Sequence, residues 1–192
     1  MIHFSPDEIS ERANYKFLIG SIIPRPIALI TSVSQKDVLN IAPFSYFNIV
    51  TSNPPILSVA LQRKNGNLKD TARNILAKKE AVIHIVNREN VDEANLTAAN
   101  LLEDESEIDL TNFTLAPSKT IQTPGLKEAK IRFEVELEKH VPLDNNGVPS
   151  VDLMLLKIKQ YHIDEEIYHE GRIDPRALGV VSRLAGHDYA EI

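Results

Sequence analysis

The clearest alternation of hydrophobic and polar residues begins after Lys130. Apolar side chains occupy every second position and charged ones occupy the positions between, which is typical of a half-buried β-strand. Asn145-Asn146-Gly147 then gives a turn signal, and the β-rich run 151–163 follows it. We therefore expect two long, paired strands in the second half of the chain. The apolar positions are Ile131, Phe133, Val135 and Leu137, and the polar ones are Arg132, Glu134, Glu136 and Glu138.

Shorter apolar runs predict four more strands in the first half of the chain, at 27–33, 39–50, 56–61 and 81–86. Helices are expected at 6–17, at 68–79 with Asn67 as candidate N-cap, and at 92–102. Because helices separate few of the strands, the pattern favours a mainly β fold with peripheral helices. An antiparallel barrel or sandwich fits this pattern better than a βαβ arrangement.

Length and composition narrow the class of protein further. The 192 residues suffice for a substantial core, and we expect a single domain over 1–192. The formal net charge of −6, with scattered basic residues, disfavours nucleic acid as a partner. The absence of cysteine excludes disulfides and thiolate chemistry. The chain shows no leader pattern and no apolar stretch of the roughly 18 residues that a membrane helix needs. We therefore expect a soluble cytoplasmic protein with no membrane association.

The stretch 40–48 combines a strand-like composition with a proline. Pro43 has no N–H to donate and fixes its own φ, so it does not fit an ordinary paired strand. We expect the chain to bend or leave the sheet near Pro43, turning the amides of Ala42, Phe44 and Ser45 toward another acceptor. A flat heteroaromatic ligand is one such acceptor. The alternative interpretation is a bulged strand with a polar rim.

The expected start of the helix at 68–79 is a second candidate binding feature. Free N–H groups and the positive end of the helix dipole can hold a phosphate there, with Lys69 and Thr71 assisting. Asp70 supports the opposite interpretation, because a carboxylate in the first turn caps a helix and repels an anion. Arg25, between two prolines, is a cation with a restrained position, and an ordinary surface arginine is the alternative.

Several familiar catalytic motifs are missing from the sequence. It contains no G-x-G-x-x-G, no P-loop and no G-x-S-x-G elbow. The six histidines lack metal-ligand spacing, so we expect no metal site and name no catalytic side chain. His84 is interpreted as a partly buried structural histidine within a strand. The acidic segment 103–107 is interpreted as a solvated loop.

Five short elements resemble the flavin reductase-like, FMN-binding split-barrel family, and they occur in the family's order over nearly the full chain. The resemblance implies an antiparallel Greek-key split β-barrel, a homodimer, and FMN bound near the subunit interface. Members of this group commonly pass hydride or electrons between a reduced nicotinamide and flavin. The elements are PRPIAL at 24–29, NIAPFSYFN at 40–48, NPP at 53–55, Lys69-Asp70-Thr71 with Asn74, and RLAGHDY at 183–189.

The resemblance also implies which residues hold the flavin. Residues 31–32 lie near it, and the isoalloxazine edge meets Asn40, Ala42 and Ser45. The start of the helix serves the phosphate or ribityl end. Asn74 steadies that helix. The expected cofactor-binding residues are Thr31, Ser32, Asn40, Ala42, Pro43, Ser45, Lys69, Thr71 and Asn74.

Two positions depart from the family pattern. Ala185-Gly186 stands where the family usually has a glycine pair, and the loop 35–38 lacks a glycine often found before the asparagine. Both departures concern the shapes of loops, and neither removes an expected flavin contact.

The function implied by the resemblance is that of an FMN-dependent oxidoreductase. The simplest version is an NAD(P)H:flavin reductase acting alone or with a partner oxygenase or redox protein. Because the cofactor performs the redox step, no side-chain acid or nucleophile is required. Two alternatives stay open, namely an FMN-binding electron carrier and a flavin-free structural or interaction barrel.

Overall fold

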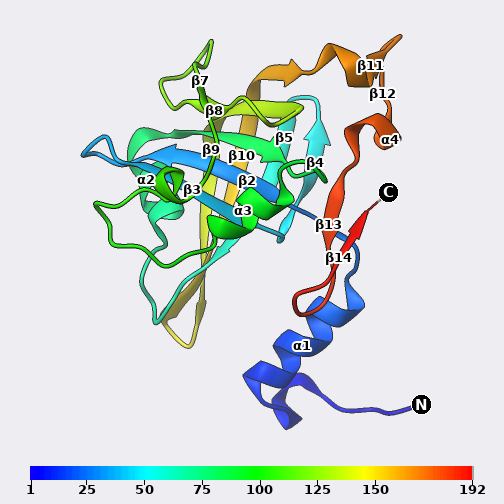
Figure 1. The fold of residues 1–192 in the computed structure, drawn as a ribbon. Coiled ribbons are helices and arrows are strands. Elements are labelled where there is room, and N and C mark those ends of the chain that lie inside the picture. The colour runs from blue at the N-terminus through cyan, green and yellow to red at the C-terminus, as the bar shows by residue number, and fades with distance from the viewer. Residues whose placement is uncertain (192) are drawn as a thin grey trace.

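The two long strands expected in the second half form one hairpin. The computed structural model describes residues 1–191. In it β9 (Ile131–Asn145) and β10 (Val148–Ile163) pair antiparallel along their length, which confirms the prediction (Figure 1). The connecting residues Asn146 and Gly147 have φ values of 53° and 80°, as a tight two-residue turn requires.

Within residues 1–191, seven strands form one antiparallel sheet in the order β3-β2-β6-β9-β10-β5-β4. The mainly β, antiparallel prediction is therefore confirmed. The other strands of this sheet are β2 (Ala28–Val33), β3 (Leu39–Phe44), β4 (Phe47–Ser52), β5 (Pro55–Gln62) and β6 (Glu80–Ile85).

One hydrophobic core joins both ends of this sheet. Ile30 from β2, Leu61 from β5 and Met154 from β10 are all fully buried in the same cluster. Strands that are far apart in the sheet order can share a core only if the sheet curves around it, as Figure 1 shows. Ala72 and Ile75 of α2 (Asp70–Lys78) complete the cluster, so this helix is fixed against the barrel.

The expected strand 39–50 is two strands, and the break expected near Pro43 falls just after it, at Ser45 and Tyr46, rather than at the proline itself. β3 stays paired with β2 through Phe44, and the chain leaves the sheet at Ser45 and Tyr46 before β4 begins. The sheet tolerates Pro43 because β3 is its edge strand, where an outward N–H has no strand partner to lose.

The amides of this strand therefore differ from the prediction. Ile41 directs its N–H outward, where it donates to a Glu107 carboxylate oxygen at 2.8 Å. Because amide directions alternate along a strand, the N–H groups of Ala42 and Phe44 point toward β2. Of the three amides expected to be free, only that of Ser45 lies outside the ladder.

The helices are shorter than the sequence predicts. The segment expected at 6–17 is a single turn, η1 (Pro6–Glu8), followed by α1 (Glu11–Ser21), and the helix expected at 92–102 is α3 (Val91–Leu96). The helix expected at 68–79 is confirmed as α2, although Lys69 rather than Asn67 is its N-cap. None of the helices among the described residues is long and apolar enough to cross a membrane. The remaining helical turns are η2 (Glu107–Leu110), η3 (Glu165–Ile167) and α4 (Pro175–Leu178).

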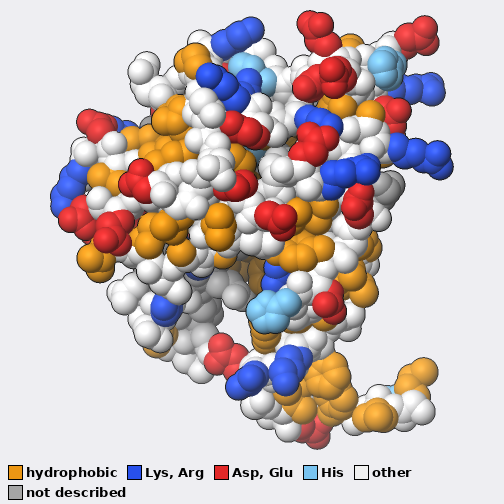
Figure 2. All heavy atoms as spheres, viewed as in Figure 1, with side chains coloured by type: hydrophobic (Ala, Val, Ile, Leu, Met, Phe, Trp, Pro, Cys, Tyr) orange, Lys and Arg blue, Asp and Glu red, His pale blue; other side chains and the backbone are white. Residues whose placement is uncertain are grey.

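Helix α1 lies beside the barrel and leaves most of its apolar side chains uncovered. Ile19 is the buried residue of this helix, whereas Leu18 and the following Ile22 are 57% and 61% exposed. Figure 2 shows hydrophobic side chains gathered over this region at the bottom of the view. Between α1 and strands β4 and β5 lies a groove of about 800 Å³, called here the α1 groove.

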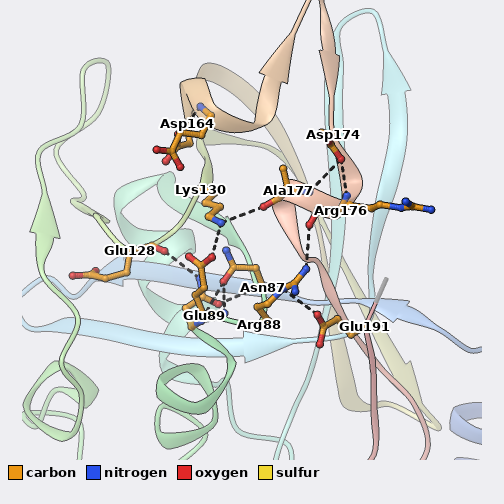
Figure 3. Close-up of polar contacts among 12 residues, drawn as sticks. Asn87, Arg88, Glu89, Glu128, Lys130, Asp164, Asp174, Arg176, Ala177 and Glu191 are labelled. Carbon is orange, nitrogen blue, oxygen red and sulfur yellow. Dashed lines mark hydrogen bonds and ion pairs between the residues drawn. The ribbon is translucent and has the colours of Figure 1, made fainter.

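Polar contacts fasten the C-terminal segment to the end of β6 (Figure 3). Arg88 donates to the Arg176 carbonyl oxygen at 3.1 Å and forms an ion pair with Glu191 at 3.0 Å. These contacts hold β13 (Val181–Arg183), which pairs with β14 (Tyr189–Glu191) and with β1 (Arg25–Pro26). The short strands elsewhere are β7 (Leu115–Ala116), β8 (Gly125–Leu126), β11 (Tyr168–His169) and β12 (Arg172–Ile173).

Arg25 is a buried link between the two ends of the chain rather than a surface arginine. Its guanidinium donates to the carbonyl oxygens of Ile19 and Ile22, at 2.7 and 2.6 Å, and thereby caps the end of α1. It also donates to the Leu184 carbonyl oxygen at 2.8 Å. Arg25 thus adds one side-chain contact to the strand pairing that positions the C-terminal motif.

Two charged or titratable positions are more buried than the sequence indicates. His84, expected to be partly buried, is fully buried between the Leu29 carbonyl oxygen and the Leu126 amide, and burial lowers its pKa to about 3. Its structural interpretation agrees with these two hydrogen bonds. Glu134, placed by alternation on the polar face of β9, is also fully buried.

Candidate functional site

Two adjoining clefts open where β3, the start of α2 and the C-terminal segment meet. The first, called the helix cleft, has a volume of about 350 Å³ and is bordered by β3, the loop 64–69 and the segment 97–101. The second, called the tyrosine cleft, has a volume of about 290 Å³ and includes Tyr15, Tyr46 and Tyr189. Pro43, Phe44, Lys69 and Ala98 line both clefts, so the two are continuous along the end of β3.

Four of the predicted site residues form one buried hydrogen-bonded cluster beneath the helix cleft. Asn40 Nδ2 donates to Thr71 Oγ1 at 2.8 Å and to Ser32 Oγ at 3.4 Å. Asn74 Nδ2 donates to the same Ser32 oxygen at 3.2 Å. This cluster ties β2, β3 and α2 together, so the first turn of α2 has a fixed position relative to the edge strand.

The remaining predicted residues are distributed unevenly around the clefts. Ala42 and Pro43 line the helix cleft, and Ser45 lines the tyrosine cleft. Thr31 lies apart from them, because it is fully buried and its hydroxyl donates to the Pro124 carbonyl oxygen at 2.7 Å. Neighbouring residues of a strand face opposite sides, which separates Thr31 from Ser32.

The start of α2 leaves backbone donors available at the helix cleft. Its N-cap is Lys69, whose ammonium group has no acceptor to offer the helix amides, and Lys69 Nζ lies 5.7 Å from the centre of the Phe44 ring. Asp70 does not cap the helix either, because its carboxylate pairs with Arg73 at 2.5 Å. Asp70 therefore does not occupy the position where an anion would bind. Cationic Lys69 and the N-terminus of α2 face the same cleft.

The tyrosine cleft contains residues that the sequence motifs do not predict as site residues. Arg183 lies 4.7 Å from the centre of the Tyr189 ring and hydrogen-bonds its hydroxyl. The Tyr189 hydroxyl in turn donates to Asn95, and Arg183 also holds the Gly186 carbonyl oxygen at 2.6 Å. The motif at 183–189 is the sequence feature that could have indicated these residues. It contributes Arg183, Gly186 and Tyr189 to one wall of the cleft.

Glu107 is the second unexpected member of the site. It belongs to the acidic segment interpreted as a solvated loop, yet it is 7% exposed and lines the helix cleft. Burial raises the pKa of its carboxyl group, while the hydrogen bond from the Ile41 amide acts in the opposite direction. The prediction of solvation is wrong at this position, because a long-range contact with β3 buries the side chain.

Comparison with known proteins identifies the fold. A flavin reductase-like domain model matches residues 19–176. Nitrilotriacetate monooxygenase component B from Bacillus cereus is 49% identical, with a TM-score of 0.98 over 100% of this chain and 96% of that chain. The 2-nitrobenzoate 2-nitroreductase NbaA from Pseudomonas fluorescens is 27% identical, with a TM-score of 0.86 over 99% and 91%. A split-barrel protein from Shewanella frigidimarina NCIMB 400 is 22% identical, with a TM-score of 0.83 over 100% and 95%, and shows the fold alone.

The protein is therefore an antiparallel split β-barrel, as the sequence resemblance implied. More particularly, the chain belongs to the flavin reductase-like family.

Proposed function

We propose that this chain is an FMN-dependent NAD(P)H:flavin reductase of the cytoplasm. The observation that supports it best is the continuity of the two clefts through Phe44 and Lys69. One cleft offers a cation and free helix amides, which suit a phosphate, and the other offers aromatic walls, which suit a flat ring. FMN is a ligand that carries both groups. Membership of the flavin reductase-like family supports the same assignment.

The chain's own residues have distinct roles in this proposal. Lys69 and the first amides of α2 bind the phosphate, and Thr71 is held by Asn40 in a fixed place beside it. The amide of Ser45, outside the strand ladder, is a donor for the edge of the ring. Thr31, which faces Pro124, contributes to the fold beneath the site rather than to contact with the cofactor.

FMN, when bound, supplies the redox chemistry by accepting hydride from a reduced nicotinamide. The protein's contribution is to orient the ring, to donate hydrogen bonds toward its polar edge and to exclude water with Phe44 and the tyrosines. Arg183 and Tyr189 lie at the wall of the tyrosine cleft where an anionic or flat co-substrate can approach. No side chain is assigned a proton transfer, so no catalytic residue is named.

A homodimer is part of the proposal, and the exposed side of α1 supports it. A stable monomer rarely leaves a contiguous apolar surface uncovered, and α1 with the following segment presents one beside the α1 groove. A second copy of the chain would cover this surface. Its exposed apolar residues are Tyr15, Phe17, Leu18, Ile22 and Ile23.

The test is to titrate the purified protein with FMN and follow oxidation of NADH and of NADPH, with sedimentation to measure the mass. We expect saturable FMN binding, turnover with at least one nicotinamide, and a dimer. If a chemical reductant reduces the bound FMN but neither nicotinamide does, the protein is an electron carrier rather than a reductase. Failure to bind FMN would favour a flavin-free barrel.

A partner oxygenase that uses the reduced flavin is also part of the proposal, and the similarity to a monooxygenase component supports that role.

A further inference from the structure

A separate concave site lies between the segment 119–130 and the ends of β9 and β10. It has a volume of about 320 Å³ and shares no lining residue with the helix cleft, the tyrosine cleft or the α1 groove. We call it the basic hollow. Its lining residues are Lys119, Lys127, Ala129, Lys130, Arg132, Tyr161, His162, Ile163 and Asp164. Four of the nine are lysine or arginine, although the chain as a whole has a formal net charge of −6.

Most of this positive charge is not neutralised within the protein. Lys130 pairs with Glu89 at 2.6 Å, as Figure 3 shows, but Lys119 and Lys127 have no ion pair among residues 1–191. Arg132 donates one N–H to the Leu126 carbonyl oxygen at 3.0 Å and has no ion pair among the described residues either. Three cations therefore remain for a ligand.

The acidic groups close to the hollow are already engaged. Asp164 lines it, but one of its oxygens caps the turn that follows by accepting from the Glu166 amide at 2.9 Å. The charges of Glu134 and Glu128 both act on Arg132. Glu128 accepts the Thr114 amide with both oxygens. These acids reduce the local positive charge without forming ion pairs with Lys119, Lys127 or Arg132.

Glu134 lies buried behind the hollow and organises its wall. Its carboxylate accepts the amides of Lys119 and Thr120, at 2.6 and 2.7 Å, and the Thr120 hydroxyl. It also accepts a hydrogen bond from His162 Nε2 at 2.6 Å. Burial by itself would raise the pKa of Glu134, and these hydrogen bonds outweigh that effect and lower the pKa to about 2. The backbone at Lys119 and the ring of His162 are thus held in place before any ligand arrives.

We propose that the basic hollow binds a small, multivalent oxyanion at Lys119, Lys127 and Arg132. Cations that line a concave, mostly polar wall are the chemistry that recognises phosphoryl or carboxylate oxygens, and the guanidinium adds directional hydrogen bonds. The predominance of charged and polar lining residues favours a compact anion over an aromatic nucleotide. Phosphoryl and carboxylate ligands share this chemistry, so the experiment has to distinguish them.

The test uses the full chain saturated with FMN and isothermal titration with inorganic pyrophosphate and, separately, with citrate at constant ionic strength. We expect one site per chain with a Kd of about 1 mM or lower for at least one anion. Tighter binding of pyrophosphate identifies a phosphoryl ligand, and tighter binding of citrate identifies a polycarboxylate. The absence of binding by both anions would overturn the proposal.

Matched variants separate a built site from general attraction to positive charge. The double variant Lys119→Gln with Lys127→Gln should weaken anion binding about tenfold and leave FMN affinity unchanged. The control, Lys16→Gln with Lys139→Gln, removes the same charge from exposed positions outside the hollow. Equal weakening by the two double variants would show non-specific attraction, and an equal loss of FMN affinity in the test variant would show that the hollow is not independent. Either result would refute the assignment.

Discussion

Asn40 Nδ2 donates to Thr71 Oγ1 over 2.8 Å, and this single hydrogen bond joins the edge strand β3 to the first turn of α2. Both side chains are buried, so water does not replace the contact. The geometry of the helix cleft therefore depends on a buried polar pair in its wall. The first variants change this pair and the neighbouring cation Lys69.

Thr71→Val should lower both stability and FMN affinity, because it leaves the buried Asn40 amide with only the longer Ser32 contact. We expect a loss of about 1–3 kcal/mol in the free energy of unfolding and clearly weaker flavin binding by fluorescence titration. Thr71→Ser retains the hydroxyl and is the control. Val and Ser variants with the same FMN affinity would show that the hydroxyl has no role.

Lys69→Gln should weaken FMN binding about tenfold and riboflavin binding much less, because riboflavin lacks the phosphate. Lys64→Gln is the matched control, since Lys64 also lines the helix cleft but is not at the helix N-cap. The measurement is the dissociation constant of each flavin at low and at moderate salt. If Lys69→Gln weakened both flavins equally, its assignment to the phosphate would be wrong.

Glu107→Gln should strengthen FMN binding severalfold at neutral pH, because it removes a negative charge from the wall of the helix cleft. The amide oxygen of glutamine can still accept the Ile41 N–H, so the fold of β3 is retained. The difference between the variant and the parent should shrink as the pH falls and Glu107 becomes protonated, since burial raises its pKa. Flavin titration at several pH values checks this, and a difference that is constant with pH would contradict the charge explanation.

Arg25→Met should destabilise the protein by about 2–3 kcal/mol, because three carbonyl oxygens lose a charged donor. Arg172→Met, at an exposed position, should change the free energy of unfolding by less than roughly 0.5 kcal/mol. Denaturant unfolding measures both. The C-terminal segment should also become more accessible to protease, and unchanged cleavage there would argue against the link through Leu184.

Stability should fall as the pH drops below about 6.5, through the titration of His84. Its pKa is lowered to about 3 in the folded protein, so between these values the unfolded chain binds a proton that the folded chain does not. The stabilisation is complete above the unfolded pKa and is lost as the pH falls, by up to about 1.4 kcal/mol per pH unit. His84→Gln should show a shallower slope between pH 6 and 5, whereas the exposed His3→Gln should match the parent. Identical slopes for all three proteins would contradict this origin.

The sequence by itself determined the elements whose hydrophobic pattern is local. The alternation after Lys130 predicted β9, and the apolar stripe of α2 predicted the helix that packs on the barrel. Four of the residues that the short motifs assigned to the cofactor, Ser32, Asn40, Thr71 and Asn74, share one hydrogen-bonded cluster, and their contact with flavin stays a prediction. Strand β9 and helix α2 depend on strand and helix periodicity, which neighbouring residues set among themselves.

Only the tertiary structure decided which charged side chains are buried. Arg25, Glu107 and Glu134 lie in stretches whose local pattern is that of exposed residues, yet each is enclosed because distant backbone groups satisfy its charge. The same holds for Pro43, which stays in its strand because β3 is at the sheet edge. Burial of a charge depends on partners supplied by remote segments, and periodicity along the chain carries no information about those partners.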